Sequence, residues 1–281
     1  MPDARRPRVV VVGGTDPLGG AGAFADACNV SAWGGVPLPI VTSVVAQNSR
    51  GVMAAWPVEA AALQGSLDAL VADVAPGAAK VGLVVDPAHH RAIADALAAA
   101  GLLSATRVDV VVDPVLRSGG IDASPLVMDS SARGYRTSLE PWMRAGVLLT
   151  PNAVELSALS GVAISNADRP SRETLVRMAT DLAERTACAI LVKTGHSDQP
   201  GRDLLVLGRS VVELAALQPW TSDVHGTGCR LSSAIAYGLA RGEGLVAAVE
   251  WARAELASAV RERLVQLGSG RAQLLPAASS A

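Results

Sequence analysis

The chain has 281 residues, and its 24 basic and 26 acidic side chains leave a formal net charge of −2. This near-neutral balance argues against nucleic-acid binding, which depends on neutralising phosphates. No apolar run reaches the roughly 18 residues of a membrane span, and the charged start MPDARRPR lacks the apolar segment of a secretory signal. The three cysteines, Cys28, Cys188 and Cys229, form no CxxC pair, so neither a disulfide framework nor a zinc site is predicted. These features favour a cytoplasmic enzyme.

Short apolar runs alternate with longer segments of helical period, a pattern typical of βαβ units and a parallel sheet. The predicted strands cover residues 9–12, 38–45, 79–84, 108–112, 146–149 and 189–192, with a hairpin at 203–207 and 211–215. The predicted helices cover residues 22–33, 58–73, 87–100, 126–144, 152–160, 171–185, 226–241 and 245–265. Because the strands are apolar throughout, helices are expected on both faces of the sheet. We predict an α/β fold, with one three-layer α/β/α domain and a mostly parallel central sheet over residues 1–268, and a loose tail over 269–281.

The segments that follow the predicted strands are rich in glycine, amide and carboxylate groups. They are residues 13–16, 47–48, 82, 113–114, 150–152 and 193–196. In an open parallel sheet, ligands bind beyond the carboxyl ends of the strands. This edge of the sheet is therefore the predicted small-molecule site.

The strongest local motif is His225-Gly226-Thr227-Gly228-Cys229, which opens a predicted helix. Glycines at a helix start let the backbone approach a ligand, and the first N–H groups favour an anion there. A cysteine in that turn is expected to have a lowered thiol pKa and to serve as a base or nucleophile. The alternative is a glycine-rich turn with a buried cysteine that acts as a small hydrophobic side chain.

The first predicted strand runs into a second glycine-rich loop, GGTDPLGGAG, at residues 13–22. Its glycines allow close backbone approach to a ligand, but it lacks the GxxxxGK[ST] pattern of a P-loop. A dinucleotide-binding reading is disfavoured, since the glycines begin several residues after the strand and no acid follows the second strand. Asp26, one turn into the next helix, is by itself typical of a solvated helix residue.

Two charged groups at strand ends have both structural and functional interpretations. Asn152 and Glu155 match a helix-capping arrangement, but they also suit a hydrated Mg²⁺ together with Asp113. Lys193 ends a strand, where it either neutralises phosphate or lies on the surface as an ordinary cation. Lys80 and Lys193 are the only lysines in a chain that otherwise uses arginine, which marks both for attention, although chance surface positions remain the alternative. His89 and His90 are predicted to be solvated.

With GGTDPLGGAG, Ala25-Asp26, VAQN, KVG, VVDPV, LTPNAVE, VKTGH and HGTGC in this order, the chain resembles the hydroxymethylpyrimidine/phosphomethylpyrimidine kinases of the ribokinase-like superfamily. The resemblance covers residues 9–267. It implies Mg²⁺-dependent transfer of the ATP γ-phosphoryl group to 4-amino-5-hydroxymethyl-2-methylpyrimidine or its monophosphate, in thiamine biosynthesis. It also implies a small-molecule pyrimidine partner, no nucleic acid or membrane partner, and a homodimer.

The same resemblance implies roles for individual residues, grouped by what they contact. Cys229 would act as the base beside an anion hole of Gly226, Thr227 and Gly228. The pyrimidine pocket would use Gly14, Asp26, Val45, Gln47 and Leu83, and the Gln47 amide offers one donor and one acceptor to an aminopyrimidine. Lys193, Asn152 and His225 would bind ATP, and Asp113 and Glu155 would bind the metal.

Three departures from the family pattern leave other functions open. Val224 stands where threonine is usual, Arg230 follows Cys229 where threonine is usual, and residues 116–121 lack the usual Lys-Ser-Gly-Asp run. A pyridoxal or pyridoxine kinase of the same superfamily is one alternative. A non-catalytic pyrimidine-binding sensor is the other, prompted by Val224 and Arg230.

Overall fold

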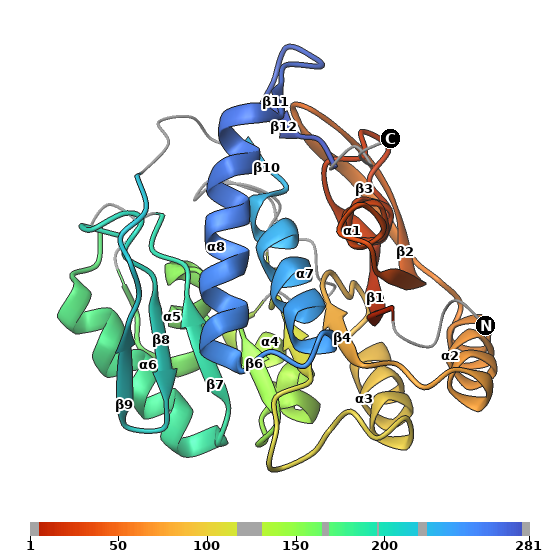
Figure 1. Cartoon of the computed structure of the whole chain (residues 1–281), viewed down its shortest axis with the longest axis horizontal. Helices are drawn as coiled ribbons and strands as arrows, with labels where there is room; N and C mark the ends of the chain where they lie inside the picture. The colour runs from red at the N-terminus through yellow and green to blue at the C-terminus, as the bar shows by residue number, and fades with distance from the viewer. Residues whose placement is uncertain (1–5, 117–130, 165–168, 196, 219–223, 277–281) are drawn as a thin grey trace.

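A nine-stranded sheet forms the centre of the computed structural model, which describes residues 6–116, 131–164, 169–195, 197–218 and 224–276 (Figure 1). Its strand order is β3-β2-β1-β4-β5-β6-β7-β8-β9. The bounds are β1 Arg8–Gly14, β2 Val36–Asn48, β3 Gly51–Pro57, β4 Ala78–Val81, β5 Val110–Val112, β6 Val147–Leu149, β7 Ala189–Val192, β8 Leu204–Leu207 and β9 Ser210–Glu213. Strands β2, β1 and β4 to β7 are parallel, while the pairs β2–β3, β7–β8 and β8–β9 at the two edges are antiparallel.

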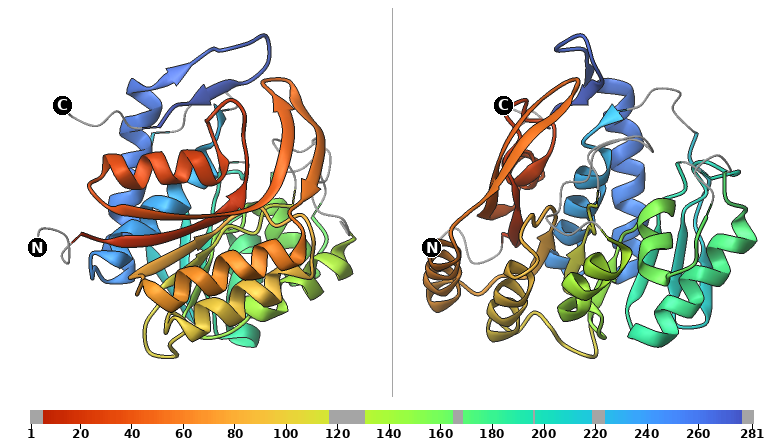
Figure 2. Two further views of the ribbon diagram at one scale, coloured as in Figure 1. Left: turned by 90° about the vertical axis from the view of Figure 1, so that its right-hand side faces the viewer. Right: turned by 180° about the vertical axis from the view of Figure 1, so that it is seen from behind.

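Helices cover both faces of this sheet, as the apolar strands predict (Figure 2). The bounds are α1 Gly22–Ala32, α2 Ala60–Asp73, α3 His89–Ala99, α4 Ala132–Leu139, α5 Ala153–Ser160, α6 Arg172–Thr186, α7 Thr227–Ala240 and α8 Leu245–Glu262. Along β1, Val10 and Val12 enter the core under α2 to α6, whereas Val9 and Val11 enter the core under α1, α7 and α8. The period-two alternation of strand side chains thus supplies both cores. The predicted fold class is confirmed.

The edge strand β3 is absent from the predicted elements. Its residues are mostly half-exposed, with Met53 and Trp56 among the most exposed apolar side chains, so it lacks the continuous burial that marks the central strands. The predicted helix over 126–144 is shorter in the described region, where α4 ends at Leu139 and a 3-10 turn follows over Glu140–Trp142. Residues 126–130, His196 and most of the 116–121 departure lie outside the described residues.

A second, three-stranded sheet consists of β10 (Val224–His225), β11 (Leu264–Val265) and β12 (Ala272–Leu274). This corrects the predicted loose tail: in its described part, β12 pairs with β10, and Gln273 and Leu274 are buried. It also explains why α8 ends before 265, since Leu264 and Val265 form β11. Strand β12 has only three residues, so tertiary pairing and not a local pattern stabilises it.

His89 and His90 are buried, which corrects their prediction as solvated residues. His90 Nδ1 accepts a hydrogen bond of 2.9 Å from the indole N–H of Trp142. Burial lowers the pKa of His90 to about 4, with the neighbouring His89 adding to the effect. His90 is therefore a neutral core residue at physiological pH, where it satisfies a buried tryptophan.

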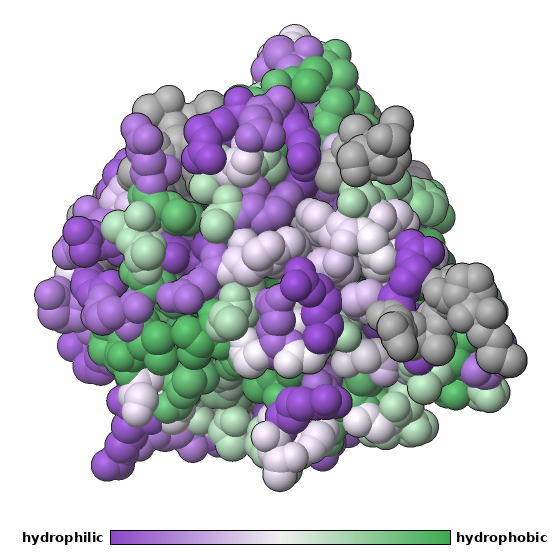
Figure 3. Space-filling model, in the orientation of Figure 1, coloured by the Kyte–Doolittle hydropathy of each residue, from purple (hydrophilic) through white to green (hydrophobic). Residues whose placement is uncertain are grey.

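The outer face around α8 mixes hydrophilic and hydrophobic residues, with hydrophilic ones widespread in the space-filling view (Figure 3). Amphipathic helices that cover a sheet show this mixture on the side facing solvent. Within the described residues, no helix combines the length and the apolar character needed to cross a membrane.

Candidate active site

The carboxyl ends of β5, β6 and β7 bring one lysine and two carboxylates together. Lys193 Nζ lies 2.6 Å from Asp113 Oδ1 and 3.8 Å from Glu155 Oε2. An isolated parallel β-bridge between the backbones of Asn152 and Lys193 holds the ends of β6 and β7 in register. We refer to Lys193, Asp113 and Glu155 as the Lys193 cluster. Its members come from segments far apart in the sequence, and the sheet places them at the edge predicted for ligand binding.

Glu155 has both of the features that the sequence left open. It forms a capping box, since its N–H donates to Asn152 Oδ1 at 3.0 Å and its Oε2 accepts from the Asn152 N–H at 2.8 Å. Burial raises the pKa of its carboxyl to about 7; Lys193 opposes this shift and Asp113 adds to it. The helix cap therefore holds in place a buried carboxyl that sits beside a second one.

The start of α7 faces this cluster. A Cβ built on Gly228 would lie 3.3 Å from Asp113 Oδ2 and 3.4 Å from Lys193 Nζ, so this glycine is packed close to both charges. Gly226 has φ +93°, and a Cβ there would lie 2.0 Å from the carbonyl oxygen of Gly20. Only glycine fits such a position. No side chain caps α7 in the described chain, so its first N–H groups open toward the edge where an anion would bind.

Cys229 is a partly buried thiol in the first turn of α7. Burial raises its pKa to about 11, against the opposing effect of the Lys80 ammonium. The predicted lowered pKa is therefore wrong for the protein without ligands, because desolvation outweighs the helix start. The thiol is held in its neutral form at neutral pH.

Arg230, the cation that follows Cys229 in the sequence, turns away from the thiol. Its guanidinium is buried, bonds to Glu255 at 2.9 Å and to Asn29 at 2.6 Å, and lies 5.5 Å from the ring centroid of Trp33. It thus ties α7 to α8 and α1, and points into the helix layer. Val224, the other departure beside the motif, is a buried core residue of β10. Both departures have structural explanations.

A second ion pair, which we call the Lys80 cluster, lies deeper under α7. Lys80 Nζ is 2.5 Å from Asp26 Oδ2, and Ser233 donates to Asp26 Oδ1 at 2.7 Å. Both charged side chains are fully buried, so Asp26 is not a solvated helix residue and Lys80 is not a surface lysine. Burial alone would lower the pKa of Lys80, but the Asp26 carboxylate outweighs it and the pKa is raised. The rarity of lysine in this chain and the KVG motif at residues 80–82 were the sequence signals for Lys80.

Gly14, Val45 and Leu83 lie together at the end of β1. A Cβ on Gly14 would be 3.2 Å from both Val45 Cγ2 and Leu83 Cδ2, and 2.6 Å from Ser43 Oγ. Glycine is therefore required here for packing, and the three residues expected to face the pyrimidine share one apolar wall. The Asp26 carboxylate, by contrast, has both oxygens bonded to Lys80 and Ser233.

Asp16 is a site residue that the sequence reasoning did not single out. It is buried in the glycine-rich loop after β1, and its Oδ2 lies 3.0 Å from His225 Nε2. Burial raises its carboxyl pKa, but hydrogen bonds, first from His225, outweigh that effect and leave the pKa lowered. The contact joins two glycine-rich segments 209 residues apart. Both motifs were visible in the sequence, but their pairing was not.

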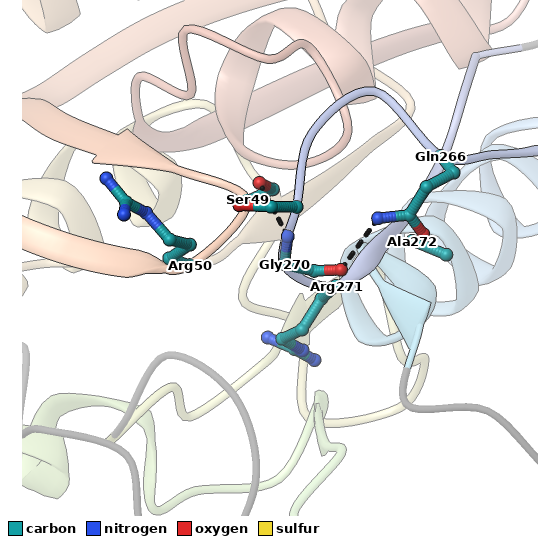
Figure 4. A pocket seen from close by; sticks show the side chains of 7 residues that line it. Ser49, Arg50, Gln266, Gly270, Arg271 and Ala272 are labelled. Atoms are coloured by element: carbon teal, nitrogen blue, oxygen red, sulfur yellow. Dashed lines mark hydrogen bonds between the residues drawn. The ribbon is translucent and has the colours of Figure 1, made fainter.

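The C-terminal segment borders a pocket of about 520 Å³, whose lining includes no residue of the Lys193 or Lys80 cluster (Figure 4). Gly270 N–H donates to Ser49 Oγ at 3.2 Å, and Arg271 N–H donates to the Ser49 carbonyl at 2.8 Å. Arg50 and Arg271 approach the pocket from the β2–β3 hairpin and the C-terminal segment, respectively. Residues 270 and 271 are therefore hydrogen-bonded to the turn of the hairpin that carries Gln47.

The doubly covered, mostly parallel sheet, with a glycine-rich helix start at its carboxyl edge, has a ribokinase-like fold. Two solved structures share this fold. The phosphomethylpyrimidine kinase of Clostridium difficile 630 has a TM-score of 0.74, 24% identity, and coverage of 91% of this chain and 100% of its own. The pyridoxal kinase of Staphylococcus aureus in complex with AMP-PCP has a TM-score of 0.81, 22% identity, and coverage of 96% and 93%.

Sequence comparison places the chain more narrowly. The family model described as phosphomethylpyrimidine kinase matches residues 16–274. The hydroxymethylpyrimidine/phosphomethylpyrimidine kinase of Rhizobium meliloti is 36% identical over 271 residues, which cover 92% of this chain and 93% of the relative. The chain belongs to the phosphomethylpyrimidine kinase family, and the resemblance drawn from its motifs is confirmed.

Proposed function

We propose that this chain transfers the γ-phosphoryl group of ATP to 4-amino-5-hydroxymethyl-2-methylpyrimidine, to its monophosphate, or to both, in thiamine biosynthesis. The observation that carries the proposal is the Lys193 cluster packed against Gly228 at the start of α7. It places a cation, two carboxylates and helix N–H groups around one point, as phosphoryl transfer requires. Membership of the phosphomethylpyrimidine kinase family indicates that a pyrimidine accepts the phosphoryl group.

The proposed roles follow the two sides of the site. Lys193, Asn152 and His225 hold ATP, and the N–H groups of residues 226–228 stabilise the charge on the transferred phosphoryl group. Gly14, Val45, Leu83 and Gln47 line the pyrimidine pocket, with Asp26 behind them. Cys229 accepts the proton of the attacking hydroxyl in its thiolate form, after its own proton has left, and the Lys80 ammonium favours that form.

Mg²⁺ fits the residues of the Lys193 cluster. In proteins it is usually bound by one or two carboxylates together with substrate phosphates and water. Asp113 and Glu155 are two neighbouring buried carboxyls beside one lysine, and burial raises the pKa of Glu155 to about 7, with Asp113 adding to the shift. These two residues would hold the ion, which would neutralise phosphate charge when bound.

A pyridoxal kinase is the second candidate, because pyridoxal kinases share this fold. Gln47 favours the aminopyrimidine, since its amide N–H can donate to a ring nitrogen while its carbonyl oxygen accepts from the adjacent amino group. The non-catalytic alternative loses its motivation, because Val224 and Arg230 serve the helix layer and the core.

The test measures ADP release with Mg²⁺ and ATP while hydroxymethylpyrimidine, its monophosphate and pyridoxal are offered in parallel. We expect turnover to depend on Mg²⁺ and to be fastest with one of the pyrimidines. Phosphorylation of pyridoxal at least tenfold more efficient than that of both pyrimidines would replace the leading function with the second candidate.

We also propose that the protein acts in the cytoplasm, where its donor ATP is made, and that it is a homodimer. Val44, Met53 and Trp56 on the β2–β3 hairpin are more than half exposed, and such a patch suits a protein interface. Light scattering of the wild type and of Trp56→Glu measures the oligomeric state directly. A monomeric wild type would contradict the dimer.

A further inference from the structure

Arg253 of helix α8 has a buried guanidinium that contacts three acceptors from the segments around β8 and β9. Its Nε donates to Asp203 Oδ2 at 2.9 Å, and its two terminal nitrogens donate to the carbonyl oxygens of Ala215 at 2.7 Å and Gly201 at 2.9 Å. Each nitrogen of the planar group thus has its own partner, an arrangement that a lysine ammonium cannot reproduce.

Asp203 connects this guanidinium to the residue after Lys193. Strand β8 runs antiparallel to β7, so its start lies beside the end of β7, where the ladder closes with the pair of Val192 and Leu204. One residue beyond that pair, Asp203 Oδ1 accepts the Thr194 N–H at 2.9 Å and the Thr194 hydroxyl at 3.2 Å. The carboxylate therefore extends the ladder past its last backbone pair, while its other oxygen is held by the guanidinium.

The backbone at Lys193 is consequently held from both sides. Its own N–H donates to the Pro151 carbonyl at 2.9 Å on the β6 side, while the Thr194 N–H donates to Asp203 on the β8 side. Thr194 is buried, and its carbonyl accepts both the N–H and the hydroxyl of Ser197 at 2.9 Å. Because the N–H groups at and after Lys193 are both bonded, the direction in which its side chain leaves the strand is fixed.

This support lies on the side of the site away from the apolar wall expected to face the pyrimidine. In the sheet order, β1, which carries Gly14, is separated from β7 by β4, β5 and β6, and β8 lies one strand further out. Arg253 and Asp203 are therefore remote from that wall, and their contacts reach the site through the backbone at Lys193. The geometry predicts an influence on the nucleotide and not on the pyrimidine.

We propose that Arg253 and Asp203 are positioning residues that fix the backbone after β7 and so hold the Lys193 ammonium in place for the phosphates of ATP. The proposal rests on the proposed function, because that function assigns Lys193 to ATP. The hydrogen bonds above use both oxygens of Asp203 and all three guanidinium nitrogens of Arg253, so the pair acts through Thr194. A site whose supporting side chains are removed becomes loose even though its contact residues remain.

Asp203→Asn tests the inference, because an amide has one oxygen and cannot accept from both Thr194 and Arg253. We expect the dissociation constant for ATP with Mg²⁺, measured by calorimetry without pyrimidine, to rise about tenfold, and KM for hydroxymethylpyrimidine to stay within twofold. Glu255→Gln is the matched control, since Arg230 and Glu255 are 2% and 14% exposed, nearly the same as 2% and 13% in the tested pair. It should lower the melting temperature about as much and leave ATP affinity within twofold.

A double-variant cycle shows whether the effect passes through Lys193, which a general loss of stability would not require. Residues that act as one unit give non-additive effects. We therefore expect Asp203→Asn to lower kcat/KM for ATP about tenfold in the wild-type background and less than twofold in the Lys193→Ala background. Equal losses in the two backgrounds overturn the inference, as does unchanged ATP affinity in Asp203→Asn.

Arg253→Lys and Arg253→Met keep the inference testable if Asp203→Asn is poorly folded. The first keeps a charge beside Asp203 but loses the planar group, so ATP affinity should fall about threefold; the second should lose about tenfold. Wild-type affinity in Arg253→Met overturns the inference alone. A wild type that binds no ATP overturns the proposed function itself.

Discussion

The Lys80 and Lys193 clusters have the same chemistry but differ in access and in charge balance. The ammonium–carboxylate distances are 2.5 Å for Lys80 and Asp26, and 2.6 Å for Lys193 and Asp113. Lys80 is 0% exposed and Lys193 is 19% exposed. Asp26 has both oxygens bonded, whereas the Lys193 cluster contains Glu155 as a second carboxyl. The Lys80–Asp26 pair is buried and fully hydrogen-bonded, so it organises the fold. The Lys193 cluster is accessible and contains one carboxyl more than its single lysine, so it offers a binding place for phosphate and a cation.

The comparison predicts its largest effect for Lys193→Ala. We expect kcat/KM to fall by about 10²–10³, the typical cost of removing one group that stabilises transition-state charge. The melting temperature should change by only a few degrees, since the side chain reaches solvent. ADP release and thermal unfolding measure the two quantities. Near-normal turnover in this variant would remove the functional distinction between the two lysines.

Lys80→Met should act mainly on stability. Removing one partner of a buried ion pair costs about 3–5 kcal/mol, because the Asp26 charge is left uncompensated. Adding Asp26→Asn should recover part of that loss in the unfolding free energy, measured by urea denaturation. If the double variant is as unstable as Lys80→Met alone, the stranded Asp26 charge is not the cause.

Cys229 lies between the two clusters, and the Cys229→Ser variant shows whether its thiol takes part in catalysis or only packs there. Serine keeps the hydrogen bonding but is a far poorer base, so we expect kcat to fall about 10²-fold with little change in pyrimidine affinity. Because the raised pKa keeps the thiol neutral, iodoacetamide should label Cys229 slowly at neutral pH without ligands. Cys28, which is exposed, provides the labelling control. Wild-type kcat in the serine variant would make the thiol a bystander.

Glu155→Gln should have the smallest effect on activity, a loss of somewhat more than tenfold. The change keeps an oxygen for the capping box and removes the charge that would hold Mg²⁺. The folded protein holds the proton to about pH 7, so the stability contributed by this carboxyl is present below pH 4.5 and is lost as the pH rises through 7. Unfolding free energies should therefore show the wild type losing stability relative to Glu155→Gln between pH 5 and about 8. A constant difference across that range would contradict the raised pKa.

The central strands were predictable because they are continuously apolar and buried on both faces. The carboxyl-end rule then placed Asp113 and Lys193 at one edge of the sheet before any contact was known, and the capping pattern after Asn152 drew attention to Glu155. The edge strand β3 escaped prediction because it is half-exposed, and β12 because three residues carry no pattern.

The contacts at the site that the sequence did not predict join residues that are far apart in the chain. Asp26 and Lys80 are 54 residues apart, and Asp16 and His225 are 209 apart, so no local rule joins them. The pKa of Cys229 was mispredicted because the helix start was visible in the sequence, whereas the depth of burial and the turn of Arg230 toward Glu255 were not.

The pairing of β12 with β10 has a consequence for how the protein is made. The loop that carries Asp16 leaves the ribosome early, but Gln273, which packs behind it, is among the last described residues to be synthesised. At about 5–20 residues per second, roughly 13–50 s separate the two. During that interval the nascent chain holds its glycine-rich loop, and later its anion hole, without the strand that backs them. Catalytic competence should therefore appear late in synthesis, and nascent chains halted before 272 should lack it even when their main sheet has formed.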